Sequence, residues 1–147
     1  MKPKRILVVE DDPVMLQVIS RIVSSEGFDV VPCNNGPKAV HEALTSKPAL
    51  ILLDLMMPSP DQGLCPVFDG HTVLSWRASV ADLRDTPVIV ITAKPAAQYK
   101  LRALNEGACA YLQKPLDRKR LLNAVRIALD DGYQGQPGGF QLGASLI

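Results

Sequence analysis

The sequence lacks the cysteine pattern of a disulfide-bonded or zinc-binding protein. Its three cysteines, Cys33, Cys65 and Cys109, are odd in number and widely spaced, and no Cys-x-x-Cys pair occurs. A disulfide framework needs paired cysteines, and a structural zinc site needs closely spaced ligands. The pattern therefore favours reduced thiols in a cytosolic protein, and we expect these cysteines to be small buried apolar residues.

The sequence also lacks a long hydrophobic run near its start and an excess of charge of one sign. The apolar run at residues 6–9 is followed at once by Glu10, Asp11 and Asp12, so it is neither a signal peptide nor a membrane span. The net charge of +1 creates no global field that would attract nucleic acid or a membrane. We therefore expect a cytoplasmic location, no membrane association and no direct nucleic-acid binding.

What the sequence contains is an alternation of apolar runs and amphipathic segments. With 147 residues, 47% hydrophobic and 21% charged, the chain has the size and composition of one globular domain. Five runs are predicted to be strands, at residues 6–9, 28–32, 50–53, 87–91 and 109–113. Each precedes a predicted helix, starting near Pro13, Asn35, Asp69, Pro95 and after Pro115. This alternation predicts an α/β fold with a parallel sheet covered by helices on both faces.

The spacing of apolar residues predicts which side of each helix is buried. Asp12 before Pro13 is typical of a helix N-terminus, with the carboxylate as the cap. The first helix is expected to bury Met15, Val18, Ile19, Ile22 and Val23, and the second Val40, Ala43 and Leu44. The fourth, at about residues 95–106, is expected to bury Leu101 and Leu104, and the fifth Leu121, Leu122, Val125 and Leu129. All these sets follow the 3.6-residue helical period.

Polar residues follow four of the predicted strands: Glu10 and Asp11, Asp54, Thr92, and Lys114. In a parallel sheet these strand ends lie along one edge, where open α/β sheets bind their ligands. Three carboxylates close together repel one another. A hard divalent cation with oxygen ligands, Mg2+ or Mn2+, would neutralise them. Carboxylates with a metal, a lysine and a hydroxyl are suited to phosphoryl chemistry.

Six short motifs occur in order along the chain: Val8-Val9-Glu10-Asp11-Asp12, Asp54-Leu-Met-Met-Pro58, Asp69-Gly70, Thr92-Ala93, Gly107-Ala108 and Tyr111-Leu-Gln-Lys114-Pro115. Their combination resembles the receiver domain of two-component response regulators, over about residues 4 to 130. The resemblance implies a flavodoxin-like receiver fold, a five-stranded parallel sheet of order 2-1-3-4-5 with five helices on both faces. We expect residues 1–130 to be the receiver domain. The Gly-rich residues 131–147 are expected to be a tail or the start of a linker.

The resemblance also implies a phosphorylation site and a metal site. Asp54 would be the phosphoacceptor. The cofactor would be Mg2+, with Mn2+ as the alternative, held by Asp11, Asp54 and the backbone carbonyl of Met56. Glu10 would act on the metal through a water molecule, whereas Asp12 would cap the helix.

Further roles are implied for residues at the ends of the last two strands. Thr92 and Lys114 would stabilise the phosphoryl group, and the peptide bond before Pro115 would be cis, a geometry that proline makes inexpensive. Thr92 and Tyr111 would form a two-state switch whose balance phosphorylation shifts.

The implied function is a phosphorylation-dependent signalling switch rather than an enzyme acting on a separate metabolite. Its own reactions would be at most self-phosphorylation from small donors and self-dephosphorylation. The phosphoryl donor would be a sensor histidine kinase or a phosphotransfer protein. A downstream effector would read the Thr92/Tyr111 face, and a phosphorylation-dependent homodimer is compatible with this scheme.

Three alternatives remain open at this point. A metal-dependent phosphohydrolase using Asp54 as its nucleophile would usually carry a second acid two residues later, where this chain has Met56. A small nucleotide-binding domain would need a Gly-rich phosphate loop after the first strand, and none is present. A receiver-like interaction module that is not phosphorylated is disfavoured by the complete set of site residues.

The chain departs from the family pattern in two places. Asp69 follows Pro58 by eleven residues, which indicates an insertion of about eight residues, and we hypothesise that residues 59–68 shape access to the site for water or a partner. Cys109 and Ala110 stand where many DNA-binding relatives carry acidic residues of a charged dimer interface. Dimers of that type are therefore less favoured here.

Overall fold

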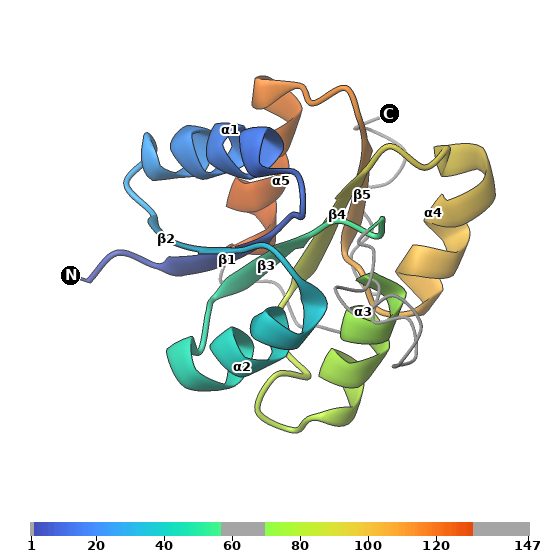
Figure 1. Ribbon diagram of the computed structural model, residues 1–147, viewed down its shortest axis with the longest axis horizontal. Helices are drawn as coiled ribbons and strands as arrows, with labels where there is room; N and C mark the ends of the chain where they lie inside the picture. The colour runs from blue at the N-terminus through green and yellow to red at the C-terminus, as the bar shows by residue number, and fades with distance from the viewer. Residues whose placement is uncertain (1, 57–69, 131–147) are drawn as a thin grey trace.

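The computed structural model describes residues 2–56 and 70–130 of the chain (Figure 1). The strands are β1 (Arg5–Val9), β2 (Asp29–Cys33), β3 (Leu50–Leu53), β4 (Val88–Thr92) and β5 (Ala110–Gln113). The helices are α1 (Pro13–Ser24), α2 (Gly36–Ser46), α3 (Gly70–Ser79), α4 (Ala96–Asn105) and α5 (Arg118–Ala128). The predicted loop at 59–68, Asp69, Cys65 and the predicted tail at 131–147 lie outside the described residues.

The five strands form one parallel sheet in the order β2-β1-β3-β4-β5. This confirms the predicted fold class and strand order. Every residue of β3 and β4 is buried, because these strands lie inside the sheet and helices cover both of its faces. Strands in that position need apolar residues on both sides, which explains why their sequences are continuous apolar runs rather than alternating ones.

Two helical layers enclose the sheet. Helices α1 and α5 cover one face, and α2, α3 and α4 cover the other (Figure 1). Successive residues of a strand point to opposite faces, so Leu7 and Val9 of β1 join the cluster under α2 and α3, whereas Ile6 and Val8 join the cluster under α1 and α5. Within the described ranges, no helix is both long enough and apolar enough to cross a lipid bilayer.

Helix α1 begins where the sequence predicted, directly after the acidic residues that follow β1. The Asp12 side chain accepts hydrogen bonds from the backbone N–H groups of Val14 and Met15, at 2.9 and 3.4 Å, and Pro13 occupies the first turn. The first N–H groups of a helix have no partner within it, so a carboxylate at this position stabilises the helix. The predicted cap is confirmed, and α1 anchors the segment that carries Glu10 and Asp11.

The predicted buried faces of α1, α2 and α4 were partly wrong. Leu101 is 70% exposed, whereas Leu104 and its neighbour Ala103 are buried. Leu44 in α2 and Val18 in α1 are also exposed. Large apolar residues at helical spacing suggested these positions, but the periodicity leaves the rotation of a helix uncertain by about one residue. The sheet surface instead accepts small side chains, Ala39 and Ala43 in α2 and Ala103 in α4.

The expected burial of the cysteines is confirmed for the two that the structure describes. Cys33 and Cys109 are buried, and burial raises the pKa of the Cys33 thiol. Trp76 is partly buried against the core under α2 and α3. The second strand starts and ends one residue later than predicted, at Asp29 and Cys33.

The corrected orientation of α4 predicts different effects for two leucines in one helix. Leu104→Ala is expected to lower the free energy of unfolding by about 2–4 kcal/mol, because it leaves a cavity at a buried position. Leu101→Ala, at an exposed position of the same helix, is expected to change it by less than about 0.5 kcal/mol. Urea denaturation of both variants measures these values, and equal losses would contradict the orientation.

Candidate functional site

The site residues are held at the carboxyl edge of the sheet by backbone hydrogen bonds that continue the strand ladders. The Glu10 N–H donates to the Cys33 carbonyl at 2.9 Å, and the Asp54 N–H donates to the Val9 carbonyl at 3.1 Å. The Lys114 N–H donates to the Thr92 carbonyl at 2.8 Å. Each functional residue therefore follows its strand by one position while its backbone is still fixed by the neighbouring strand.

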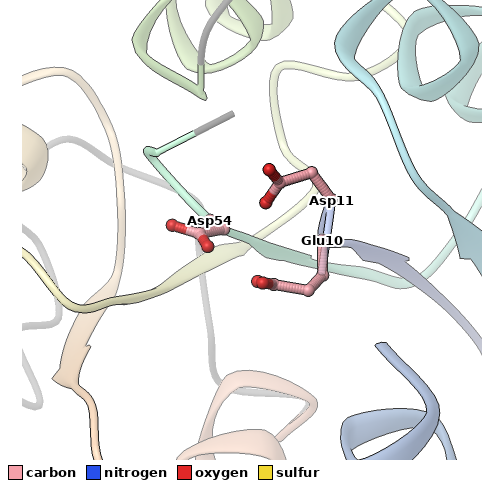
Figure 2. Close-up of side chains that lie close together, drawn as sticks. All are labelled: Glu10, Asp11 and Asp54. Atoms are coloured by element: carbon pink, nitrogen blue, oxygen red, sulfur yellow. The ribbon is translucent and has the colours of Figure 1, made fainter. Parts of the chain in front are cut away.

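Three carboxylates meet at this edge. Figure 2 shows the side chains of Glu10 and Asp11, from the end of β1, next to that of Asp54, from the end of β3. One carboxylate oxygen from each residue lies within 4.8 Å of the others. Glu10 and Asp54 are only 1% and 3% exposed, so water screens their mutual repulsion poorly.

Lys114 supplies the positive charge that this arrangement requires. Its Nζ atom lies 3.1 and 3.2 Å from the two carboxylate oxygens of Glu10 and 3.1 Å from Asp54 Oδ2. These are charge-assisted hydrogen bonds between groups that are almost removed from water. Removing one partner of such a pair leaves a buried charge without compensation. The three side chains therefore form a single electrostatic unit.

The cluster shifts the protonation equilibria of its members. Burial raises the pKa of Glu10 to about 8, and the hydrogen bond and negative charge of Asp54 add to the rise, which Lys114 partly offsets. For Lys114, burial lowers the pKa, but hydrogen bonds and charges of Asp54 and Glu10 outweigh burial, so the pKa is raised. The rise for Glu10 is due first to burial, whereas the rise for Lys114 shows that the two neighbouring acids outweigh the burial of its ammonium group.

The donor set suits a hard divalent cation. Glu10, Asp11 and Asp54 offer carboxylate oxygens from two adjacent strand ends, and Mg2+ prefers oxygen ligands with some sites left for water or phosphate. The chemistry of the residues therefore fits a metal of this class. Met56 lies two residues after Asp54, and its backbone N–H donates to Asp54 Oδ1 at 2.9 Å. The role of the Met56 carbonyl as a ligand stays a prediction.

Thr92 and Tyr111 are linked through the backbone of Lys94. The Thr92 hydroxyl oxygen accepts a hydrogen bond from the Lys94 N–H at 3.3 Å, and the Tyr111 hydroxyl donates to the Lys94 carbonyl at 2.7 Å. Both side chains are buried. Burial raises the pKa of Tyr111 to about 12, and the charges of Tyr99 and Asp54 contribute to the rise. The two residues of the expected switch are thus joined by a backbone segment that sequence reasoning did not identify.

Two further backbone features lie at the carboxyl edge of the sheet. The Lys114–Pro115 peptide bond is cis. Gly70, the first residue of α3, lies against the backbone of Asp54, and a Cβ atom there would stand 2.5 Å from the Leu55 Cα and closer still to the Asp54 carbonyl oxygen. Only a residue without a Cβ allows this approach. The Asp-Gly motif indicated the start of the helix but not this contact.

Comparisons with known proteins agree with this geometry. The family model of the response regulator receiver domain matches residues 6–126. The DNA-binding dual master transcriptional regulator RpaA of Synechocystis is 34% identical over 125 residues, which are 85% of this chain and 48% of RpaA. A CheY-like receiver domain protein of Methanospirillum hungatei superimposes with a TM-score of 0.76 and 25% identity, covering 88% of this chain and 95% of the other.

A third relative was solved with a metal ion. The receiver domain of the Pseudomonas aeruginosa sensor histidine kinase PA1611, with magnesium coordinated in its active-site cleft, superimposes with a TM-score of 0.74 and 30% identity. The superposition covers 86% of this chain and 98% of that domain.

A parallel sheet of this order, with acidic residues and a lysine at its carboxyl edge, defines a receiver-type signalling domain. The match over residues 6–126 shows that the chain belongs to the response regulator receiver domain family of two-component signalling. Receiver domains are signalling switches. The chain spans about half the length, or less, of the first curated relatives it matches.

The raised pKa of Glu10 predicts how the stability of the metal-free protein depends on pH. Between its ordinary pKa of 4.5 and the folded value of about 8, the folded protein holds a proton that the unfolded chain releases. The free energy of unfolding is therefore expected to fall as pH rises through this window, by up to about 5 kcal/mol.

Denaturant titrations in EDTA between pH 5 and 8.5 measure this slope. Glu10→Gln keeps the size of the side chain and one acceptor oxygen but cannot ionise, so its stability is expected to lose this part of the pH dependence. Parallel profiles for the two proteins would contradict the raised pKa.

Proposed function

We propose that this receiver domain accepts a phosphoryl group on Asp54 from a phosphohistidine, donated by a sensor histidine kinase or a phosphotransfer protein. A carboxylate oxygen of Asp54 would form a bond to phosphorus while the bond between phosphorus and the histidine nitrogen breaks, giving an acyl phosphate and free imidazole. The observation that carries the proposal is the position of Lys114, whose ammonium contacts both Asp54 and Glu10.

The residues around Asp54 support this chemistry by orienting it and by balancing charge. The Met56 N–H holds Asp54 Oδ1, and Lys114 holds Oδ2, so the carboxylate is fixed in orientation. Positioning and charge neutralisation account for most catalysis of phosphoryl transfer. Lys114 would pair with the incoming phosphoryl oxygens, and Thr92 would donate its hydroxyl hydrogen to one of them.

A divalent metal would supply further positive charge next to the transferred group. Asp11 and Asp54 would hold Mg2+ with the Met56 carbonyl, and Glu10 would act through a water molecule. Mn2+ has similar ligand preferences and would serve as a substitute. The clustered carboxylates of Glu10, Asp11 and Asp54 support the assignment independently of any relative.

The switch would involve Thr92 and Tyr111. A phosphoryl group that recruits the Thr92 hydroxyl would alter the position of Lys94, whose carbonyl accepts the Tyr111 hydroxyl. An effector that binds the surface near Tyr111 would then distinguish the two states, since a ligand shifts an equilibrium only by its difference in affinity. We place this activity in the cytoplasm.

Two features bear on assembly and on the competing hydrolase. Cys109 and Ala110 are almost inaccessible, at 3% and 0% exposure, so these positions would not contribute to a charged dimer surface. A homodimer formed on phosphorylation would use other residues.

Met56 presents a half-exposed apolar side chain beside Asp54, where a phosphohydrolase would usually have its second acid.

Phosphorylation of Asp54 predicts a covalent product. Incubation with acetyl phosphate and Mg2+ is expected to add the mass of one phosphoryl group to the wild-type protein and none to Asp54→Asn, as measured by intact-protein mass spectrometry. Asp82→Asn, which neutralises an exposed carboxylate far along the chain from the site, is the matched control and is expected to label like the wild type.

Equal labelling of Asp54→Asn would remove Asp54 from this role. Absence of labelling in the wild type, both with acetyl phosphate and with a panel of phosphorylated histidine kinases, would favour the alternative of an interaction module that is not phosphorylated.

The metal site makes a separate prediction that needs no phosphoryl donor. Mg2+ is expected to raise the melting temperature of the wild-type protein, because a ligand that binds only the folded state stabilises it. Asp11→Asn is expected to weaken the apparent affinity roughly tenfold or more. Calorimetric titration with Asp85→Asn as the exposed control measures the difference, and unchanged affinity in Asp11→Asn would exclude Asp11 as a ligand.

A further inference from the structure

The helix that follows Thr92 has no cap of its own. The residue before α4 is Pro95, which provides no side-chain hydrogen bond, although the first N–H groups of a helix lack partners within it. The N–H of Ala96 instead donates to Gln113 Oε1 at 2.9 Å. Gln113 belongs to β5, seventeen residues further along the chain. A strand residue therefore caps α4 from outside the helix.

A second attachment holds the same connection through Lys94. Its ammonium nitrogen lies 4.7 Å from the centre of the Tyr99 ring, within the range of an attractive cation–π interaction. Tyr99 is partly buried against the core under α2, α3 and α4, so the ring is a fixed support. The backbone of Lys94 meanwhile contacts Thr92 and Tyr111.

The strand register explains why these contacts converge. Tyr111 and Gln113 are two residues apart in β5, so their side chains leave the same face of the sheet. Gln113 pairs with Thr92 of β4, and Tyr111 pairs with Val90. The connection that leaves β4 after Thr92 and enters α4 at Ala96 thus passes over both side chains, and each of them hydrogen-bonds to its backbone.

We propose that Gln113 and Tyr99 are positioning residues that hold the connection from Thr92 to Ala96 in the arrangement in which the buried Tyr111 hydroxyl bonds to Lys94. Gln113 fixes the end of the connection by capping α4, and Tyr99 fixes its middle by holding the Lys94 side chain. The Gln113 side chain accepts from the Ala96 N–H, and the Tyr99 ring faces the Lys94 ammonium group. They act on the site only through the backbone.

These two attachments set the equilibrium between two states of the connection from Thr92 to Ala96. If either attachment is lost, the connection gains alternative conformations, and the population in which Lys94 accepts the Tyr111 hydroxyl falls. The consequence for signalling rests on the proposed function of Thr92 and Tyr111, but the structural effect does not. It exists in the unphosphorylated, metal-free protein.

The Gln113 contact is tested by hydrogen exchange at the Ala96 amide, resolved by NMR. Gln113→Leu removes the acceptor, and exchange at Ala96 is expected to become roughly fivefold faster, the size of effect that loss of a helix cap produces. Gln113→Glu keeps an acceptor, and a carboxylate is favoured at a helix N-terminus, so exchange is expected to stay slow. Gln98→Leu, at an exposed glutamine of the same helix, is the control.

The Tyr99 contact is tested by fluorine NMR of protein labelled with 3-fluorotyrosine, with Tyr111→Phe used to assign the Tyr111 signal. Tyr99→Leu removes the aromatic ring while keeping an apolar side chain. It is expected to enlarge the population in which the Tyr111 hydroxyl is not bonded to Lys94 by roughly two- to fivefold. Tyr99→Phe keeps the ring face and is expected to restore the wild-type spectrum. A residue that only fills space would be replaced equally well by leucine.

The outcomes separate this inference from the proposed function. If Ala96 exchange and the Tyr111 signal are unchanged in Gln113→Leu and Tyr99→Leu, the positioning roles are overturned, whether or not Asp54 is phosphorylated. Changes in both measurements support the positioning roles, even if acetyl phosphate never labels the protein. Equal effects of Tyr99→Leu and Tyr99→Phe would overturn the cation–π part and leave Gln113 as the positioning residue.

Discussion

Two almost inaccessible carboxylates, Glu10 and Asp54, share the ammonium group of Lys114 at the edge of the sheet. Charges in this position are costly unless they are paired, and one cation does not balance three acids. The three acids at the strand ends therefore carry more negative charge than Lys114 neutralises. A proton on Glu10, whose pKa is raised, removes part of this excess. A bound divalent metal would also neutralise this excess, and it would leave coordination sites for a phosphoryl group.

The rigidity of the sheet makes this charge arrangement possible. The backbones of Glu10, Asp54 and Lys114 are held by hydrogen bonds to neighbouring strands just beyond the last residue of each strand. The connection after Thr92 is held differently, by side chains from β5 and α4. Side-chain contacts of this kind are easier to exchange than ladder hydrogen bonds. The charged residues are thus fixed by the sheet, whereas the conformation of the neighbouring connection after Thr92 depends on side-chain contacts.

Sequence reasoning was most successful where the physical signal was local or repeated. Continuous apolar runs identified β3 and β4, and Asp12 with Pro13 located the start of α1. It was less successful with helix rotation, as at Leu101, because burial depends on how a helix packs and not on its period alone. It also missed the contacts of Gln113, Tyr99 and Lys94, since a glutamine in a strand or a tyrosine in a helix carries no local sign of its partner.

The sequence by itself determined the alternation of strands and helices, and it placed Glu10, Asp11, Asp54, Thr92 and Lys114 at strand ends. It did so because hydrophobic periodicity and strand termini are properties of short segments. Only the tertiary structure decided that Lys114 contacts Glu10 as well as Asp54, and that Gln113 caps α4 from β5. Contacts between residues distant in the chain depend on strand register and side-chain direction, which arise only when the whole sheet is assembled.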